Sequence, residues 1–271
     1  MTGRGELAAV AESNPFRAAI LLLADSLVAL GPHRAADIEA STLSGLLPID
    51  RDYLLVQLSS ITFGGPRFQT VECPGAECGH RLDIRFDLRS IEAGHRSVSD
   101  RVEATLDNSR SVVFRLPSSG DQAALYGMDN RGDNNTGDTD STQQADELLR
   151  RCIMRGSEPG SADIRDVLEQ GPAVRLRLGA ALAAASPELD TALELTCIHC
   201  KQPFKFVYEP VLTLMDELRA SRKALMKEVH YLAFYYHWSY TEILNLSRPM
   251  RREYLDLLDQ ELRGQSGGVA V

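Results

Sequence analysis

Hydrophobic residues recur at helical spacing near the N-terminus, which predicts two helices there. The first follows Asn14, a suitable cap, and Pro15, whose missing N–H costs nothing at a first helical position. The second follows Asp50 and ends before Gly64–Gly65–Pro66. The apolar positions are Ile20, Leu23, Leu27 and Leu30 in the first helix, and Leu54, Leu55, Leu58 and Ile61 in the second. We therefore expect a helical arm over residues 1–62.

The centre of the chain changes to a period of two, which is typical of half-buried strands. In HRLDIRFDL the alternating positions are Leu82, Ile84, Phe86 and Leu88. SVVFRL at residues 111–116 predicts another short strand, whereas GPAVRLRLGAALAAA fits either a helix or a strand. Residues 118–145 are rich in Gly, Asn, Asp, Ser and Thr, which predicts a flexible acidic loop.

Helical periodicity returns in the C-terminal part of the chain. One long helix is predicted from Leu214 to Tyr236, with its stripe at Leu218, Leu225, Val229, Leu232 and Tyr236. Ser239 and Glu242 have the spacing of a capping box and predict a short helix after Trp238. A last helix is expected with Pro249 in its first turn and Gly264 after its end.

Composition narrows the class of protein. The chain has 271 residues, five cysteines and a formal net charge of -9, enough length for one large domain or two small ones. No apolar run is long enough to span a bilayer, and no secretory pattern is visible, so we expect a cytoplasmic protein with reduced thiols. The acidic balance disfavours nucleic acid and membrane surfaces as partners, because both require local positive charge.

Four of the five cysteines form two pairs that suit a metal site. Cys73 and Cys78 have four residues between them, and Cys197 and Cys200 have two. Each pair lies in a tight turn before an alternating strand, so the same turn-and-strand unit occurs twice in the chain. Both spacings are typical of structural zinc sites. Two such knuckles supply four thiolates at the corners of a tetrahedron, which predicts a structural zinc ion.

Two alternatives stay open for these cysteines. They can be ordinary buried thiols, or Cys197 and Cys200 can be a redox pair of a thiol oxidoreductase. A redox pair normally precedes a helix, whereas here a strand follows, which favours the metal site. Four sulfurs complete the site, so we expect His80 and His199 beside it and not among its ligands. Cys152 is expected in the core.

No catalytic motif is present, and a four-cysteine site has no open coordination position, so we expect no enzymatic activity and no small-molecule substrate. The C-terminal segment carries more aromatic residues than one core can bury, which predicts a contact with another protein. The alternative is a helix buried on all sides. The expected partner-binding residues are Tyr235, Tyr236, Trp238, Tyr240, Arg248, Arg251 and Arg252.

Three segments in order resemble the assembly proteins of the T-even-type phage baseplate hub and their relatives in contractile-tail gene clusters. They are LPIDRDYLLVQLSSITFG, the knuckle with CGHRLDIRFDL, and CIHC followed by EVHYLAFYYHWSYTEILNLSRPMRREYLDLL. The resemblance implies a non-enzymatic assembly factor or structural component of a contractile, phage tail-like injection system. Its partners would be other baseplate or tail proteins, and it could be incorporated into the particle. The resemblance also implies Cys73, Cys78, Cys197 and Cys200 as the metal ligands.

These expectations combine into an α+β fold with a zinc ribbon-like centre built from two cysteine-knuckle β-hairpins. Between the helical arms we expect a first knuckle region, the acidic loop, a helical segment and a second knuckle region, at residues 63–117, 118–145, 146–186 and 187–210. The C-terminal helices take residues 211–263, and 264–271 form a loose tail. The rival function is a zinc-ribbon regulator that binds nucleic acid through Arg248, Arg251 and Arg252, which the net acidity disfavours.

Overall fold

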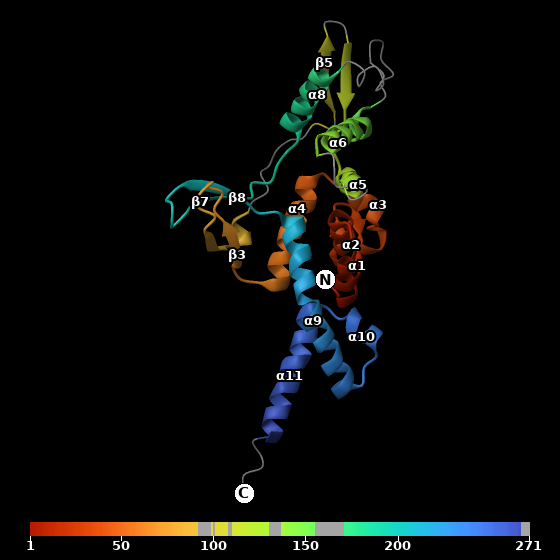
Figure 1. Ribbon diagram of the computed structural model, residues 1–271. Helices are drawn as coiled ribbons and strands as arrows, with labels where there is room; N and C mark the ends of the chain where they lie inside the picture. Colours follow the sequence, from red (N-terminus) through yellow and green to blue (C-terminus); the bar gives the residue numbers. More distant parts are fainter. Residues whose placement is uncertain (92–98, 100, 108–109, 130–136, 155–170, 267–271) are drawn as a thin grey trace. The chain divides into compact units, whose positions relative to one another are not determined.

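The computed structural model describes residues 1–91, 99, 101–107, 110–129, 137–154 and 171–266. The chain divides into two compact units. Unit 1 comprises residues 1–40, 54–91 and 191–271, and unit 2 comprises residues 41–53 and 92–190. Mixed helices and short hairpins make the protein α+β, as expected (Figure 1).

Unit 1 begins with two capped helices, α1 (Gly3–Ala11) and α2 (Pro15–Ser26), which pack together and against α9. The cap at Asn14 is confirmed, since its side chain accepts from the N–H groups of Phe16 and Arg17. The predicted stripe is too long, because α2 ends at Ser26. A short hairpin of β1 (Ala29–Leu30) and β2 (His33–Arg34) and a 3-10 turn, η1 (Ala35–Asp37), follow. The helix α1 was not predicted.

The centre of unit 1 contains two antiparallel hairpins. The first joins β3 (Arg67–Glu72) to β4 (Arg81–Phe86), and the second joins β7 (Ala192–Thr196) to β8 (Pro203–Val207). A 3-10 turn, η2 (Leu88–Ser90), follows β4. The two hairpins share no ladder of backbone hydrogen bonds, so they are two separate sheets, although they lie side by side in Figure 1. Side chains hold them together, and Val71, Leu82, Cys73 and Cys197 are buried where they meet.

The C-terminal arm of unit 1 consists of α9 (Pro210–Tyr236), α10 (Tyr240–Asn245) and α11 (Arg248–Ser266). The predicted stripe of α9 is confirmed, because Leu218, Leu225, Val229 and Leu232 are buried. His237, with φ 58°, ends α9 in the left-handed conformation. The capping box is also confirmed, with reciprocal hydrogen bonds between Ser239 and Glu242 that start α10. The last helix continues through Gly264.

Unit 2 contains several helices and a hairpin. The helices are α3 (Ala40–Ser44) and α4 (Pro48–Phe63), which both run across the boundary between the units, and α5 (Ser119–Asp129), α6 (Gly137–Cys152) and α8 (Pro172–Ala185). The hairpin joins β5 (Val102–Asp107) to β6 (Arg110–Phe114). Phe114 and Cys152 are fully buried in this core with Leu178 of α8. The open choice at GPAVRLRLGAALAAA is thus decided for a helix.

The acidic loop over residues 118–145 is a wrong prediction for most of its length. Helix α5 occupies part of it and the first half of α6 another part, while residues 130–136 lie outside the described range. The start of α5 is held by Asp121, which accepts hydrogen bonds from Ser118 N, Ser118 Oγ and the Arg115 guanidinium. Composition alone missed this helix because its polar residues have partners in the fold. Of the predicted loose tail, residues 264–266 are helical and 267–271 lie outside the described range.

Candidate metal centre and the surface of the C-terminal arm

The first cysteine knuckle connects β3 to β4. Cys73 directly follows β3, and its N–H donates to the carbonyl of His80 at 2.9 Å, which continues the pairing of the two strands. The N–H of Cys78 donates to the carbonyl of Gly75, also at 2.9 Å. Gly79 has φ +52°, a left-handed conformation that glycine adopts without strain. This turn places both sulfurs at the tip of the hairpin.

The second knuckle repeats this turn between β7 and β8. The N–H of Cys197 donates to the carbonyl of Gln202 at 3.0 Å, and the N–H of Lys201 donates back to the carbonyl of Cys197 at 2.9 Å. Lys201 has φ 62° and directly follows the second cysteine, as Gly79 does in the first knuckle. The same unit is therefore used twice, as the sequence predicted, with a left-handed residue at the equivalent position.

The two knuckles bring four sulfur atoms into one cluster. The sulfurs of Cys73, Cys78, Cys197 and Cys200 all lie within 4.8 Å of one another. The Cys73–Cys200 and Cys78–Cys197 distances are 3.6 and 3.7 Å. A tetrahedral zinc ion with Zn–S bonds of about 2.3 Å requires sulfur–sulfur distances of about 3.8 Å. The donor set and its spacing therefore fit a thiophilic metal ion such as zinc.

The electrostatics of the cluster also favour a bound cation. The backbone N–H of Cys200 donates to the Cys197 sulfur and, with that of His199, lowers the pKa of this thiol to about 6 against the effect of burial. At Cys73 the N–H of Gly75 lowers the pKa, but burial and the other thiols raise it more strongly, to about 12. One thiolate thus forms readily, whereas four together require a positive ion to offset their repulsion.

The surroundings of the cluster hold the knuckles in place. The rings of His80 and His199 stack with their centroids 5.3 Å apart, and His199 Nδ1 lies 3.6 Å from the Cys78 sulfur. Both histidines are beside the four-sulfur cluster, where the sequence placed them. Farther from the knuckles, Phe86 of β4 contacts Phe206 and Tyr208 of the second hairpin, with centroids 6.4 and 5.4 Å apart. These aromatic contacts join the two hairpins at the end away from the sulfurs.

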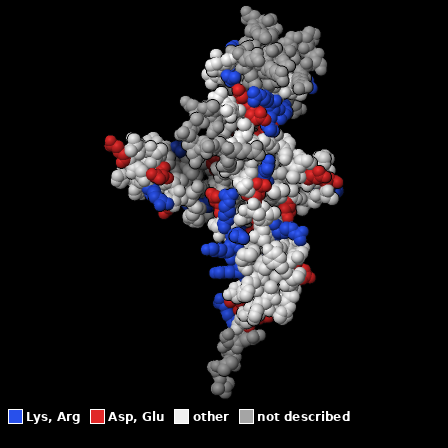
Figure 2. Space-filling view, turned by 45° about the vertical axis from the view of Figure 1, so that its right-hand side comes forward, with Lys and Arg blue, Asp and Glu red and all other residues white. Residues whose placement is uncertain are grey.

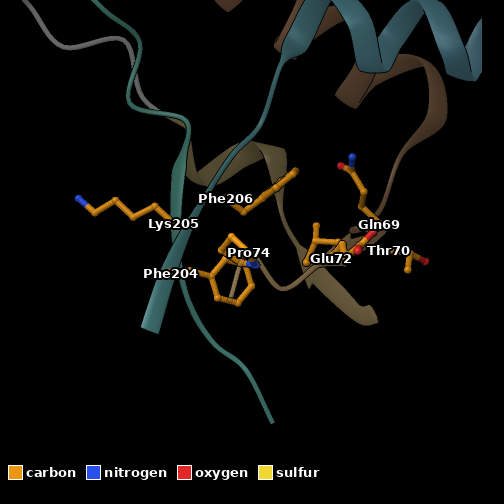
Figure 3. Close-up of a pocket in the computed structure, with 8 residues that line it drawn as sticks. Gln69, Thr70, Glu72, Pro74, Phe204, Lys205 and Phe206 are labelled. Atoms are coloured by element: carbon orange, nitrogen blue, oxygen red, sulfur yellow. The ribbon is translucent and has the colours of Figure 1, made fainter. Parts of the chain in front are cut away.

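A shallow groove of about 240 Å³ lies between β3 and β8. Figure 3 shows Phe204 and Pro74 close together in this groove, with the Lys205 side chain pointing away from them. Glu72 is the other charged residue of its lining. The lining of the groove contains neither a nucleophile paired with a base nor a cluster of carboxylates, which are the arrangements typical of catalytic sites.

The predicted partner-binding residues separate into exposed and packed groups. Tyr235 and Tyr240 are exposed, at 40% and 54%. Tyr236 and Trp238 stack on each other and contact Tyr254 of α11, so they hold the arm together. Tyr236 and Trp238 are therefore part of the core of the arm. The exposed aromatic residues of α9 lie on a different side of this helix.

The prediction that Arg248 and Arg251 contact a partner is wrong in this fold. Arg251 is fully buried and donates to Glu6 at 2.6 Å and to Glu228 at 2.9 Å. Arg248 is 6% exposed, forms an ion pair with Glu6 at 3.5 Å and stacks over Phe63. Their partners come from helices far away in the sequence, which spacing along the chain could not show. Arg252 remains exposed.

The exposed residues on the side of α9 opposite its buried stripe were not among the predicted partner-binding residues. Tyr231 and Phe234 are 49% and 63% exposed, and Lys223 and Lys227 lie on the same side one and two turns earlier. Their helical spacing was readable, since they lie opposite the buried stripe at Leu225, Val229 and Leu232. The buried stripe was predicted from the sequence, whereas its exposed opposite face was not.

The fold and the sulfur cluster define an α+β protein with a candidate four-cysteine metal centre. The chain belongs to the family described as T4 bacteriophage base plate protein, whose family model matches residues 35–216. The match includes both cysteine pairs and ends near the start of α9, so the C-terminal segment that contributed to the resemblance lies beyond it. No curated protein and no solved structure matches the chain significantly. No helix in the described ranges is long and apolar enough to cross a membrane.

Proposed function

We propose that this protein is a non-enzymatic assembly factor or structural component of the baseplate of a contractile, phage tail-like particle. A zinc ion bound by Cys73, Cys78, Cys197 and Cys200 stabilises it. The observation that carries the proposal is the family match over residues 35–216, within which the fold assembles both cysteine pairs into one cluster. Baseplate membership indicates a structural or assembly role, and its partners would be other baseplate or tail proteins.

The zinc ion would act as a cross-link in the folded chain. The cysteine pairs belong to segments of unit 1 that are separated in the sequence by residues 92–190 of unit 2. The hairpins share no backbone ladder, and a small cluster of four buried and six partly buried residues joins them, together with the ring contacts of Phe86. A bound ion would therefore add substantially to their docking. An ion that binds both hairpins would cross-link the two ends of this long intervening segment. Metal binding would then be coupled to folding.

The chemistry of the proposed site supports a structural role for the metal ion. Four thiolates complete a tetrahedral coordination sphere, which leaves no position for a water molecule or a substrate. The rival proposal of nucleic-acid binding through three arginines loses support, because Arg248 and Arg251 are buried with carboxylates and cannot reach a phosphate.

The role is tested by deleting the gene from a strain that produces the contractile particle and imaging the particles by electron microscopy. Loss of complete baseplates, restored by the wild-type gene but not by a Cys197→Ser, Cys200→Ser variant, is the expected result. Mass spectrometry of purified particles then distinguishes a permanent component from a transient assembly factor. Normal numbers of complete particles without the gene would overturn the proposal.

A further inference from the structure

One side of α9 carries positive charge that nothing in the described residues neutralises. Lys223 and Lys227 are exposed, and neither has an ion pair with another described residue. The carboxylates of the same helix are already paired: Asp216 with Arg219, Glu217 with Arg67, and Glu228 with Arg251. Lys223 and Lys227 are therefore available to carboxylates from outside this subunit.

An exposed aromatic surface continues the same side of the helix. The ring of His230 contacts those of Tyr231 and Phe234, and Phe234 contacts Tyr235, with centroids 5.0 to 6.3 Å apart. No charged residue occurs between Val229 and Thr241. Figure 2 shows this part of the arm as a white surface next to a group of Lys and Arg atoms. We call Lys223, Lys227, Tyr231 and Phe234 the basic–aromatic face of α9.

The outer side of α11 has the complementary character. Glu253, Asp256 and Glu261 are exposed and have no ion pair with another described residue, while Asp259 is paired with Arg263. Two large apolar side chains accompany them, Met250 at 45% and Leu257 at 47% exposure. We call Met250, Glu253, Asp256, Leu257 and Glu261 the acidic face of α11.

The two faces match in spacing as well as in charge. Phe234 follows Lys227 by seven residues, and Leu257 follows Met250 by seven, which is about 10.5 Å along a helix in both cases. In an antiparallel arrangement with Phe234 opposite Met250, Lys227 lies beside Asp256 and Leu257. In the same register Lys223 lies opposite Glu261. Phe234 then meets Met250, the aliphatic stem of Lys227 packs beside Leu257 with its ammonium near Asp256, and Lys223 meets Glu261.

We propose that the basic–aromatic face of α9 binds the acidic face of α11 in a second copy of this chain. The two helices cannot make this contact within one subunit. They already contact each other through their buried sides, as the Arg251–Glu228 and Tyr236–Tyr254 interactions show, so their exposed faces point outward. Made reciprocally, the contact produces a two-fold dimer. Made once per pair of subunits, it is heterologous and produces a ring or an open chain. The proposal does not depend on the baseplate role.

The test is a charge exchange read by analytical ultracentrifugation of the full chain. Wild-type protein is expected to form species larger than its 29.8 kDa monomer as concentration rises, with weaker association at high salt. Lys223→Glu, Lys227→Glu and, separately, Asp256→Lys, Glu261→Lys should each weaken association at least tenfold. Combining all four substitutions restores the net charge and both pairings, so association should return.

A matched control carries the same change of charge elsewhere. Arg34→Glu, Lys205→Glu alters two exposed cations outside α9 and α11 and should associate like the wild type. All four exchanged residues are exposed, so circular dichroism should show folded protein in every variant. A wild type that stays monomeric up to several hundred micromolar would overturn the proposal. So would a fourfold variant that does not recover, or a control that weakens association equally.

Discussion

The two cysteine hairpins and the C-terminal arm both join residues that are far apart in the sequence, but by different means. The hairpins bury four residues between them and have no shared backbone ladder. The arm buries an apolar stripe along α9 and encloses an ion-pair network, in which Arg251 of α11 reaches Glu6 of α1. From this comparison we expect the hairpins to depend on a bound ion, whereas the arm is stabilised by its own side chains.

Loss of the metal should produce the largest effect and should separate the two regions. Replacing Cys197 and Cys200 by serine is expected to abolish zinc binding and to lower the free energy of unfolding by about 5 kcal/mol or more, since structural zinc sites supply folding energy directly. Elemental analysis and thermal unfolding measure both effects. Cys152→Ala, a buried cysteine of unit 2, should keep about one zinc per chain. Zinc-free wild-type protein of equal stability would contradict the metal centre.

Removal of one buried charge should weaken the arm without affecting the metal. Arg251→Ala leaves Glu6 and Glu228 without their main partner and is expected to cost about 3–5 kcal/mol, because an unpaired buried charge is unfavourable. Its neighbour Arg252 is exposed, so Arg252→Ala should change stability by less than about 0.5 kcal/mol. Urea unfolding measures the difference. Equal effects of the two substitutions would mean that the ion-pair network contributes little.

The equivalent left-handed positions of the two knuckles should respond in opposite directions. Gly79→Ala introduces a side chain at φ +52° and is expected to destabilise by about 1 kcal/mol. Lys201→Gly removes a side chain at φ 62° and should be neutral or stabilising by up to about 1 kcal/mol. Chemical unfolding of the zinc-loaded protein measures both. Destabilisation by Lys201→Gly as large as that by Gly79→Ala would show that the two turns are not equivalent.

The smallest expected effect is a pH dependence confined to α10. Hydrogen bonds from the Ser239 side chain and backbone N–H lower the pKa of Glu242 below its usual value of 4.5. A carboxyl whose pKa is lowered by folding contributes stability above its unfolded pKa and loses it as the pH falls through the folded value. The protection of the α10 amides against hydrogen exchange, relative to the unstructured rate at each pH, should therefore fall below about pH 4.5. Glu242→Gln retains the acceptor, so the same exchange should no longer depend on this titration.

Local patterns predicted the parts whose neighbours are close in the sequence. The Asn14 cap, the Ser239–Glu242 capping box, the stripe of α9 and both cysteine turns depend on residues a few positions apart, and all are present. The prediction of an acidic loop was wrong because it considered the loop's residues without their partners in the fold. The polar residues of 118–145 look unstructured alone, but Asp121 and its partners hold the start of α5.

The sequence by itself determined the repeated cysteine turn, its chemistry and the helical periods, because covalent spacing fixes which side chains share a turn or a face. Only the tertiary structure decided that four sulfurs meet within 4.8 Å, that Arg251 is buried beside Glu6, and that the outer faces of α9 and α11 stay uncovered. These features depend on packing between segments tens to hundreds of residues apart. Burial and pairing arise from that packing, and no local pattern encodes them.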